Sequence, residues 1–281
     1  MDTMISLANQ MAPMTMEEVR TKCPYAFAED PTNPAVSGKY VHANTATVIS
    51  DMEKLGWYPV EAKQCRQKKG SSGIRSFHIV ALQNDEIKIP GPDGETESYV
   101  RIIIQNSHDG FNSFKFMCGL YRCICSNGLI LADAEFASLS IRHINYSFDE
   151  LRNVVSNIID KVPIVMSTMK RMKSVVLTDE DKRNLATKTL KIRKGVKESE
   201  KFNVDEETIS DILTPLRKED ESDDLWTVFN VCQEKMIKGG FSANGKTNKH
   251  RKQRAITSIK KDIDYNQNLW EYAMNFLPAA A

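Results

Sequence analysis

The first clear hydrophobic pattern predicts one helix followed by a series of strands. Apolar residues recur at helical spacing at Val48, Met52 and Leu55, and Asn44 or Thr45 can cap the start of this helix. Alternation of apolar and polar residues then predicts strands, separated by turn-forming residues, at 58–65, 76–82, 99–105 and 113–117. This order predicts an antiparallel sheet with one helix before it.

A compact apolar stretch at 120–131 follows the fourth predicted strand. It predicts a buried helix that runs into a tight turn at 126–128. We expect Gly128 at positive φ, a region that glycine reaches without a Cβ penalty, so that Gly128→Val would destabilise the fold. A further strand is predicted at 136–143.

From residue 146 the hydrophobic period becomes helical. Ser147 and Glu150 form a capping-box pattern at the start of the first helix, which Pro163 should kink or restart. Three further helices are predicted to open at Thr178, at 204–205 and at 223–224, and a last helix spans about 264–276.

These patterns predict an α+β protein with three regions. Residues 41–145 form a sheet-rich core with a preceding helix, and residues 146–281 form a mainly helical region with a basic loop near 239–261. Residues 1–40 are rich in Pro and Met and predict an N-terminal arm with at most a short helix at 15–21. Such an arm either packs on a neighbouring subunit or is mobile.

Composition adds few constraints. The chain has 281 residues, 41% of them hydrophobic and 27% charged, with a formal net charge of +1, so any polyanion site must come from local clustering. Its six cysteines are too sparse for a disulfide-stapled scaffold. The sequence has no signal-peptide pattern and no apolar span long enough for a bilayer. We therefore expect a cytoplasmic protein with reduced thiols.

The most uneven charge lies between Lys235 and Lys261, a window that contains no Asp or Glu. A basic loop with Gly, Asn and Ser suits phosphate contacts, since Lys and Arg neutralise phosphates and backbone amides can reach them. The alternative is an ordinary solvated loop. The residues predicted to bind nucleic acid here are Lys246, Lys249, Arg251, Lys252, Arg254, Lys260 and Lys261.

Two further basic segments are less specific. Seven cations lie between Lys182 and Lys197, but acids flank them, which favours a solvated helix face. A predicted hairpin tip carries Arg66, Lys68 and Lys69, a composition found both in phosphate-binding hairpins and in ordinary surface turns.

The sequence contains no complete catalytic or metal site. Cys118, Cys123 and Cys125 lack zinc-knuckle spacing, so we expect them to be reduced, buried and metal-free. The segment 106–110, which includes His108 and Asp109, is typical of a tight turn. There is no phosphate-cradling loop and no dinucleotide fingerprint. The sequence therefore predicts a protein that is not an enzyme and has no cofactor.

The segment 106–110 together with 119–129 resembles the signature of a phage- and plasmid-like family, domain of unknown function number 932. The similarity continues to 142–143, 230–234, 239–240, 251–254 and 268–270, and covers roughly residues 38–277. The order of elements is also similar to that of the single-strand annealing proteins of phage recombination. That second resemblance implies a β-β-β-α core, rings or filaments, and DNA held along a basic groove.

Together these features predict a phage or mobile-element DNA-binding protein of the host cytoplasm. It would bind single-stranded DNA as a homo-oligomer that anneals strands, with Trp57, Tyr58 or Phe77 as stacking platforms if they are not core residues. The alternative is a protein-interaction factor with a host protein partner, such as an inhibitor of host defence.

Overall fold

The computed structural model describes residues 12–33, 36, 40, 42–67, 75–91, 94–123, 127–130, 147–244 and 250–278. The predicted strand at 136–143 lies outside these residues, as do Lys68 and Lys69 of the predicted hairpin tip and Cys125, Lys246 and Lys249. The chain forms two compact units, Met1–Val162 and Pro163–Ala281. The predicted α+β class is confirmed.

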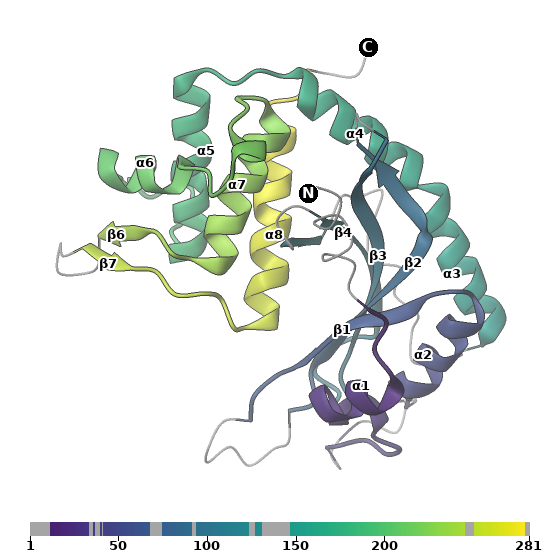
Figure 1. Cartoon of the computed structure of the whole chain (residues 1–281). Coiled ribbons are helices and arrows are strands. Elements are labelled where there is room, and N and C mark those ends of the chain that lie inside the picture. The colour runs from purple at the N-terminus through teal and green to yellow at the C-terminus, as the bar shows by residue number, and fades with distance from the viewer. Residues whose placement is uncertain are drawn as a thin grey trace, which may run out of the picture. The chain divides into compact units, whose positions relative to one another are not determined.

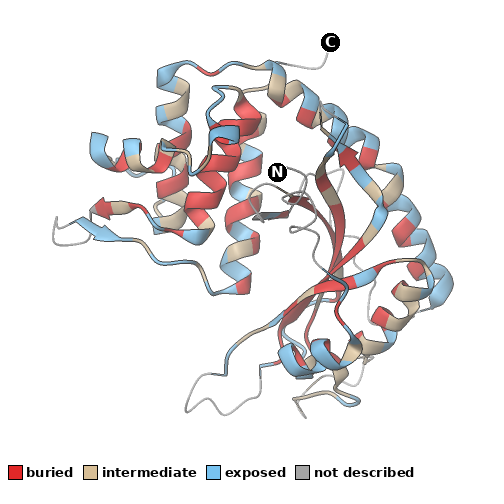
Figure 2. Ribbon diagram, in the orientation of Figure 1, coloured by how far each residue is buried: buried red, intermediate tan, exposed pale blue. Residues whose placement is uncertain are grey.

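The first unit is built on an antiparallel meander. Its strands are β1 (Tyr58–Gln64), β2 (His78–Pro90), β3 (Thr96–Asn106), β4 (Lys115–Arg122) and β5 (Asn127–Ile130). Each strand pairs with the next, in the order β1-β2-β3-β4-β5 (Figure 1). Ile102 of β3 is paired with Leu82 of β2 and with Cys118 of β4, and all three side chains are buried (Figure 2). The predicted sheet is therefore confirmed.

The helices of the first unit are α1 (Met16–Lys22), the short 3₁₀ helix η1 (Pro24–Phe27), α2 (Thr45–Lys54) and α3 (Phe148–Asp160). Asn44 caps α2 by accepting a hydrogen bond from the Thr47 amide at 3.1 Å, as the sequence predicts. Lys54, at the end of α2, lies 5.8 Å from the centre of the Phe148 ring at the start of α3. Figure 1 shows both helices on one side of the sheet.

The described part of the predicted arm, residues 12–33, packs against its own unit. The Met14 amide donates to the Pro59 carbonyl at 2.6 Å, the Thr32 amide donates to the His108 carbonyl at 2.7 Å, and Val19 is fully buried. The expectation of an arm with no place on its own domain is wrong for these residues. The sequence signal was misleading because prolines removed helical periodicity without preventing tertiary packing.

The predicted helix at 120–131 is wrong. Residues 120–122 continue β4, and β5 follows, with Leu120 paired to Leu129. A short apolar run does not distinguish a buried strand from a buried helix, and here the pairing with β3 decides. Gly128 lies within β5 without positive φ, and an added Cβ would meet nothing within 4 Å. The predicted effect of Gly128→Val therefore loses its basis.

The second unit is mainly helical. Its elements are α4 (Val162–Ser174), α5 (Asp179–Lys194), α6 (Glu206–Leu213), the 3₁₀ helix η3 (Lys218–Asp220), α7 (Leu225–Lys238), β6 (Ser242–Asn244), β7 (His250–Lys252) and α8 (Ile259–Met274). The predicted caps Thr178, Asp205 and Asp224 each accept a backbone amide hydrogen bond. The last helix begins five residues earlier than predicted, because Ser258 caps it by accepting from the Lys261 amide.

The core of the second unit lies between α5, α7 and α8. Its fully or almost fully buried members include Leu185, Leu190, Trp226, Phe229, Leu269 and Trp270. The Phe229 ring packs edge-on against Trp270, with 5.7 Å between ring centres. Among the residues that the structure describes, no helix has the length and apolar character needed to cross a membrane.

Candidate nucleic-acid interface

Strands β6 and β7 form a small two-stranded ribbon in the second unit. Ser242 pairs with Lys252, Ala243 with Arg251, and the strands are antiparallel. The ribbon is anchored to α6, because the Ser242 amide donates to the Asp211 carboxylate at 2.6 Å, and Ala243 is fully buried.

Gly239 ends α7 and begins the short connection to the ribbon. This residue has φ of +71°, and a Cβ there would lie 2.5 Å from the Gln253 carbonyl oxygen. The Gly240 amide donates to the same carbonyl at 2.9 Å. The Arg193 guanidinium, from α5, donates to the carbonyls of Met236 and Arg254. Contacts from α5 and α7 thus hold the base of the ribbon in place.

The described cations of the predicted basic loop are all exposed. Arg251 and Lys252 lie on β7, which Figure 2 draws as exposed, and Arg254 follows it. Lys260 and Lys261 lie on the first turn of α8 rather than in a loop. Within the part of the chain that the structure describes, Arg251, Lys252 and Arg254 form no ion pair with a carboxylate.

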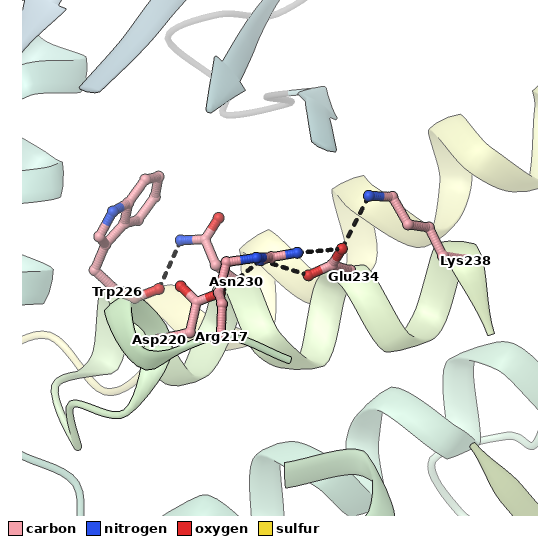
Figure 3. Close-up of polar contacts among 6 residues, drawn as sticks. All are labelled: Arg217, Asp220, Trp226, Asn230, Glu234 and Lys238. Atoms are coloured by element: carbon pink, nitrogen blue, oxygen red, sulfur yellow. Dashed lines mark hydrogen bonds and ion pairs between the residues drawn. The ribbon is translucent and has the colours of Figure 1, made fainter. Parts of the chain in front are cut away.

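Two other cations of the acid-free window do not belong to this surface. Lys235 is 5% exposed on α7. Lys238 pairs with Glu234 at 2.9 Å, and Glu234 also receives two hydrogen bonds from Arg217 (Figure 3). Both residues fall within the acid-free window, but the sequence alone does not show that Lys235 is buried or that Lys238 lies beside Glu234.

The network in Figure 3 is structural. Arg217 joins Glu234 to Asp220, 2.6 Å away, and so fixes the connection between α6 and α7. Burial raises the pKa of Glu234, but the hydrogen bonds from Arg217 and Lys238 outweigh it and lower the pKa overall. The two cations and two carboxylates compensate one another, so the network offers no net charge to a ligand.

The cations of α5 are also engaged, as a solvated mixed-charge face predicts. Lys182 pairs with Asp223 at 3.0 Å, Arg183 pairs with Glu206, and Lys188 pairs with Glu198. These pairs distinguish α5 from the ribbon, where the described cations have no such partners.

His250 opens β7 beside the start of α6. Its ring nitrogens lie 3.6 Å from the Asp205 carboxylate and 3.8 Å from that of Glu207. These three groups have the spacing of a weak cation site. They are partly or fully exposed, and Asp205 already accepts the Thr208 amide as a helix cap, so the group also has an ordinary structural explanation.

A cavity of about 330 Å³ lies between α5, α6 and α7. Apolar side chains such as Ile209, Val228 and Val231 form part of its wall. The charged groups around it include the pairs of Lys182 and Arg183 already described. The wall carries more acids than bases, because Asp179, Glu206, Asp220, Glu221 and Asp223 face only Lys182 and Arg183, so it does not favour an anionic ligand such as a phosphate.

The second predicted basic site lies at one end of the sheet in the first unit. Arg66 is exposed after β1, and it is the only predicted site residue of this hairpin within the described chain. Gln67 and Arg75 close the base of the hairpin, since the Arg75 amide donates to the Gln67 side chain at 3.1 Å. Arg75 is exposed too, and it was missed from the sequence although it belongs to the same acid-free segment.

The segment 106–110 forms the turn that the sequence predicts, and residues 106–109 are buried. Asp109 accepts the amides of Ser76 at 3.1 Å and Phe111 at 3.0 Å, and Asn106 donates to the Ala43 carbonyl at 3.0 Å. These bonds join three segments of the first unit.

His108 lies against two other imidazoles, with ring centres 4.4 Å from His42 and 5.1 Å from His78. Burial lowers the pKa of His78 to about 4. His78 is therefore neutral near pH 7, and its ring packs beside His108 in the interior of the first unit.

The predicted stacking aromatics are mostly core residues. Trp57 is fully buried and Phe77 is 5% exposed, so neither can receive a base. Tyr58 is 46% exposed, at the other end of β1 from the hairpin. The most exposed aromatic among the described residues is Phe111, at 70%. The sequence signal that could have indicated Phe111 was its position, since it is an aromatic residue in a polar turn and fits no strand or helix pattern.

The predicted burial of the cysteines is confirmed for Cys118. The five described cysteines are free, and Cys118 is buried, with a pKa that burial raises to about 12. Cys123 is only half-buried, contrary to prediction, because it follows the end of β4 rather than lying inside a helix. Cys125 lies outside the described residues.

The fold and this surface define an α+β protein of two compact units with unpaired cations on a small ribbon. The chain belongs to the family described as Domain of unknown function (DUF932), whose model matches residues 34–270. It is 29% identical to UPF0380 protein YfjQ of Escherichia coli (strain K12) over 281 residues, covering 97% of this chain and 94% of that protein. It is also 29% identical to UPF0380 protein YafZ of the same organism over 277 residues, covering 95% and 93%. No solved structure matches the chain significantly.

Proposed function

We propose that this chain is a nucleic-acid-binding protein rather than an enzyme, and that the β6–β7 ribbon contacts the phosphate backbone. The observation that carries the proposal is the contrast between two basic segments of one unit. Lys182, Arg183 and Lys188 of α5 are paired with acids, whereas Arg251, Lys252 and Arg254 are exposed and have no carboxylate partner among the described residues.

The physical reason is counterion release. A cation that already pairs with an acid neutralises little of a phosphate's charge, while an exposed unpaired cation displaces a counterion from the nucleic acid. Arg251 and Lys252 lie on the ribbon and Arg254 follows it, so three exposed cations gather on one short segment whose backbone is anchored by Asp211 and Arg193. Phosphate contacts of this kind position a protein but carry no sequence information.

The finer features of the proposal rest on resemblance. Similarity to a phage- and plasmid-like family supports a mobile-element setting in the host cytoplasm. The similarity in element order to annealing proteins supports single-stranded DNA as the ligand and a homo-oligomer as the active form. Cooperative binding along a strand would then repeat the ribbon from subunit to subunit.

Fluorescence anisotropy with labelled single-stranded and duplex oligonucleotides tests the proposal. The variant Arg251→Glu/Lys252→Glu/Arg254→Glu should bind at least about tenfold more weakly than the parent, because three favourable phosphate contacts become repulsive. The substituted side chains are exposed, so the fold should be retained.

The matched control is Lys170→Glu/Lys197→Glu/Lys201→Glu. These three residues are also exposed in the second unit, and the substitution changes the net charge by the same amount. The control should bind nearly as tightly as the parent. Equal losses in both variants would show that only total charge matters, and a parent that binds no nucleic acid would refute the proposal.

A further inference from the structure

Phe111 lies at the end of the sheet where the β1–β2 and β3–β4 connections meet. The pairing of His78 with Asn106 brings these two connections to the same end. Phe111 is 70% exposed, although burying its ring would remove a large apolar surface from water. Single exposed apolar residues are common, so exposure alone does not indicate a site.

What distinguishes Phe111 is that its backbone is held in place. Its amide donates to Asp109 Oδ1 at 3.0 Å, and Asp109 Oδ2 accepts the Ser76 amide at 3.1 Å. The Ser76 hydroxyl oxygen accepts the His108 amide at 2.7 Å. Asp109 and Ser76 are almost fully buried, so these bonds are shielded from water. The ring is therefore presented from a rigid turn.

The turn is fixed on its other side as well. The Asn112 amide donates to the Ser107 hydroxyl oxygen at 3.2 Å, which closes the loop. Gly110 has φ of +78°, and a Cβ there would lie 3.0 Å from Val36 Cγ1. A rigid aromatic loses little conformational entropy when a ligand packs on it.

The charge beside the ring is positive. The Arg75 guanidinium carbon lies 5.9 Å from the centre of the Phe111 ring. Arg66 is exposed on the neighbouring strand connection, and Lys115 begins β4 directly after the turn. Asp109, the acid of the turn itself, is buried and faces backbone amides.

Building on the proposed nucleic-acid binding, we infer that Phe111 is a stacking platform for an unpaired base and that Arg75 and Arg66 contact the adjacent phosphates. An aromatic ring can stack on a base only when that base is outside a duplex, whereas cations bind phosphates of either form. The ligand of this end of the sheet is thus single-stranded nucleic acid.

The test uses the full chain and single-stranded oligonucleotides that contain 2-aminopurine, whose fluorescence changes on stacking. Phe111→Ala and Phe111→Leu should both bind at least about tenfold more weakly than the parent and lose the fluorescence change, because leucine keeps the apolar surface but not the ring. Phe111→Tyr should keep both. Duplex binding should be the same in all four proteins.

Tyr58→Ala is the matched control, since Tyr58 is an exposed aromatic of the same sheet at the end of β1 away from the hairpin. It should behave like the parent. Unchanged single-strand binding in Phe111→Ala, or a loss in Tyr58→Ala instead, would overturn the inference.

The two proposals fail in distinguishable ways. Ribbon-dependent binding with no effect of Phe111 would leave the proposed function standing and remove only the stacking platform. A parent without any affinity for nucleic acid would remove both. A Phe111→Ala protein that loses duplex and single-strand binding equally would also overturn the stacking role.

Discussion

The hydrogen bonds around His78 determine its protonation state. Nδ1 lies 2.6 Å from the Ser76 carbonyl oxygen, which can only accept, so Nδ1 carries the proton. Nε2, 2.9 Å from Thr45 Oγ1, then accepts from the Thr45 hydroxyl, whose oxygen accepts from Asn106 at 2.9 Å. A second proton on Nε2 would reverse the direction of the Thr45 bond and place a positive charge in a site that is fully buried.

This arrangement predicts a loss of stability in mild acid. The pKa of His78 is about 4 in the folded chain and 6.5 as an ordinary value, so the unfolded chain binds the extra proton first as pH falls. The stabilisation is fully present above pH 6.5 and is lost as pH falls from 6.5 to about 4, by about 3 kcal/mol. Urea unfolding of the parent and of His78→Gln at pH 7 and pH 4 measures this. The parent should lose more stability than the variant, and parallel losses would contradict the assignment.

The sequence shows the residue types of the candidate site, but it does not show which of these residues are exposed or paired. Arg251 and Lys235 belong to the same acid-free window, yet one is exposed and the other is buried on α7. Likewise, Trp57 and Phe111 are both aromatic residues beside a strand, but burial excludes the first as a stacking platform. Burial and pairing are tertiary properties, and no local pattern encodes them.

At the scale of elements, the base of the ribbon depends on Gly239. Alanine there would combine a positive φ with a Cβ 2.5 Å from a backbone carbonyl oxygen. Gly239→Ala should therefore reduce the free energy of unfolding by about 2–4 kcal/mol, from backbone strain and overpacking together. It should also weaken nucleic-acid binding at temperatures where the chain remains folded, because the ribbon must shift.

The variant Gly195→Ala separates the cost of backbone strain from the cost of overpacking. Gly195 ends α5 with φ of +69°, but an added Cβ would meet nothing within 4 Å. It should cost only about 1 kcal/mol, the strain of the left-handed conformation. Thermal unfolding of both variants measures the difference, and equal costs would show that the contact with Gln253 is unimportant.

Helix starts were the elements best predicted from sequence, because a cap is a local contact. Thr178, Asp205 and Asp224 each satisfy backbone amides within three residues, so their signal is contained in a few positions. The segment 120–122 was misassigned because its conformation is set by pairing with β3, about twenty residues away. The ribbon was read as a loop because β6 and β7 have three residues each.

At the scale of the whole molecule, the net charge of +1 conceals local separation of charge. Arg183 and Lys188 of α5 and Arg217 pair with acidic residues. Arg251 and Lys252 of the ribbon have no carboxylate partner among the described residues. The functional prediction from sequence rested on this local clustering. In the structure, fewer cations of the window remain candidates, because Lys235 is buried and Lys238 is paired with Glu234.

The salt dependence of binding tests the central claim most directly. The slope of log K against log salt concentration counts the phosphate charges that the protein neutralises, at about 0.7 per contact for single strands. For single-stranded DNA, the slope of Arg251→Glu/Lys252→Glu/Arg254→Glu should be shallower than that of the parent by about 2, because three contacts are lost. The Lys170→Glu/Lys197→Glu/Lys201→Glu control should keep the parent's slope. The same slope in the parent and the ribbon variant would contradict the assignment of the ribbon as the phosphate-binding surface.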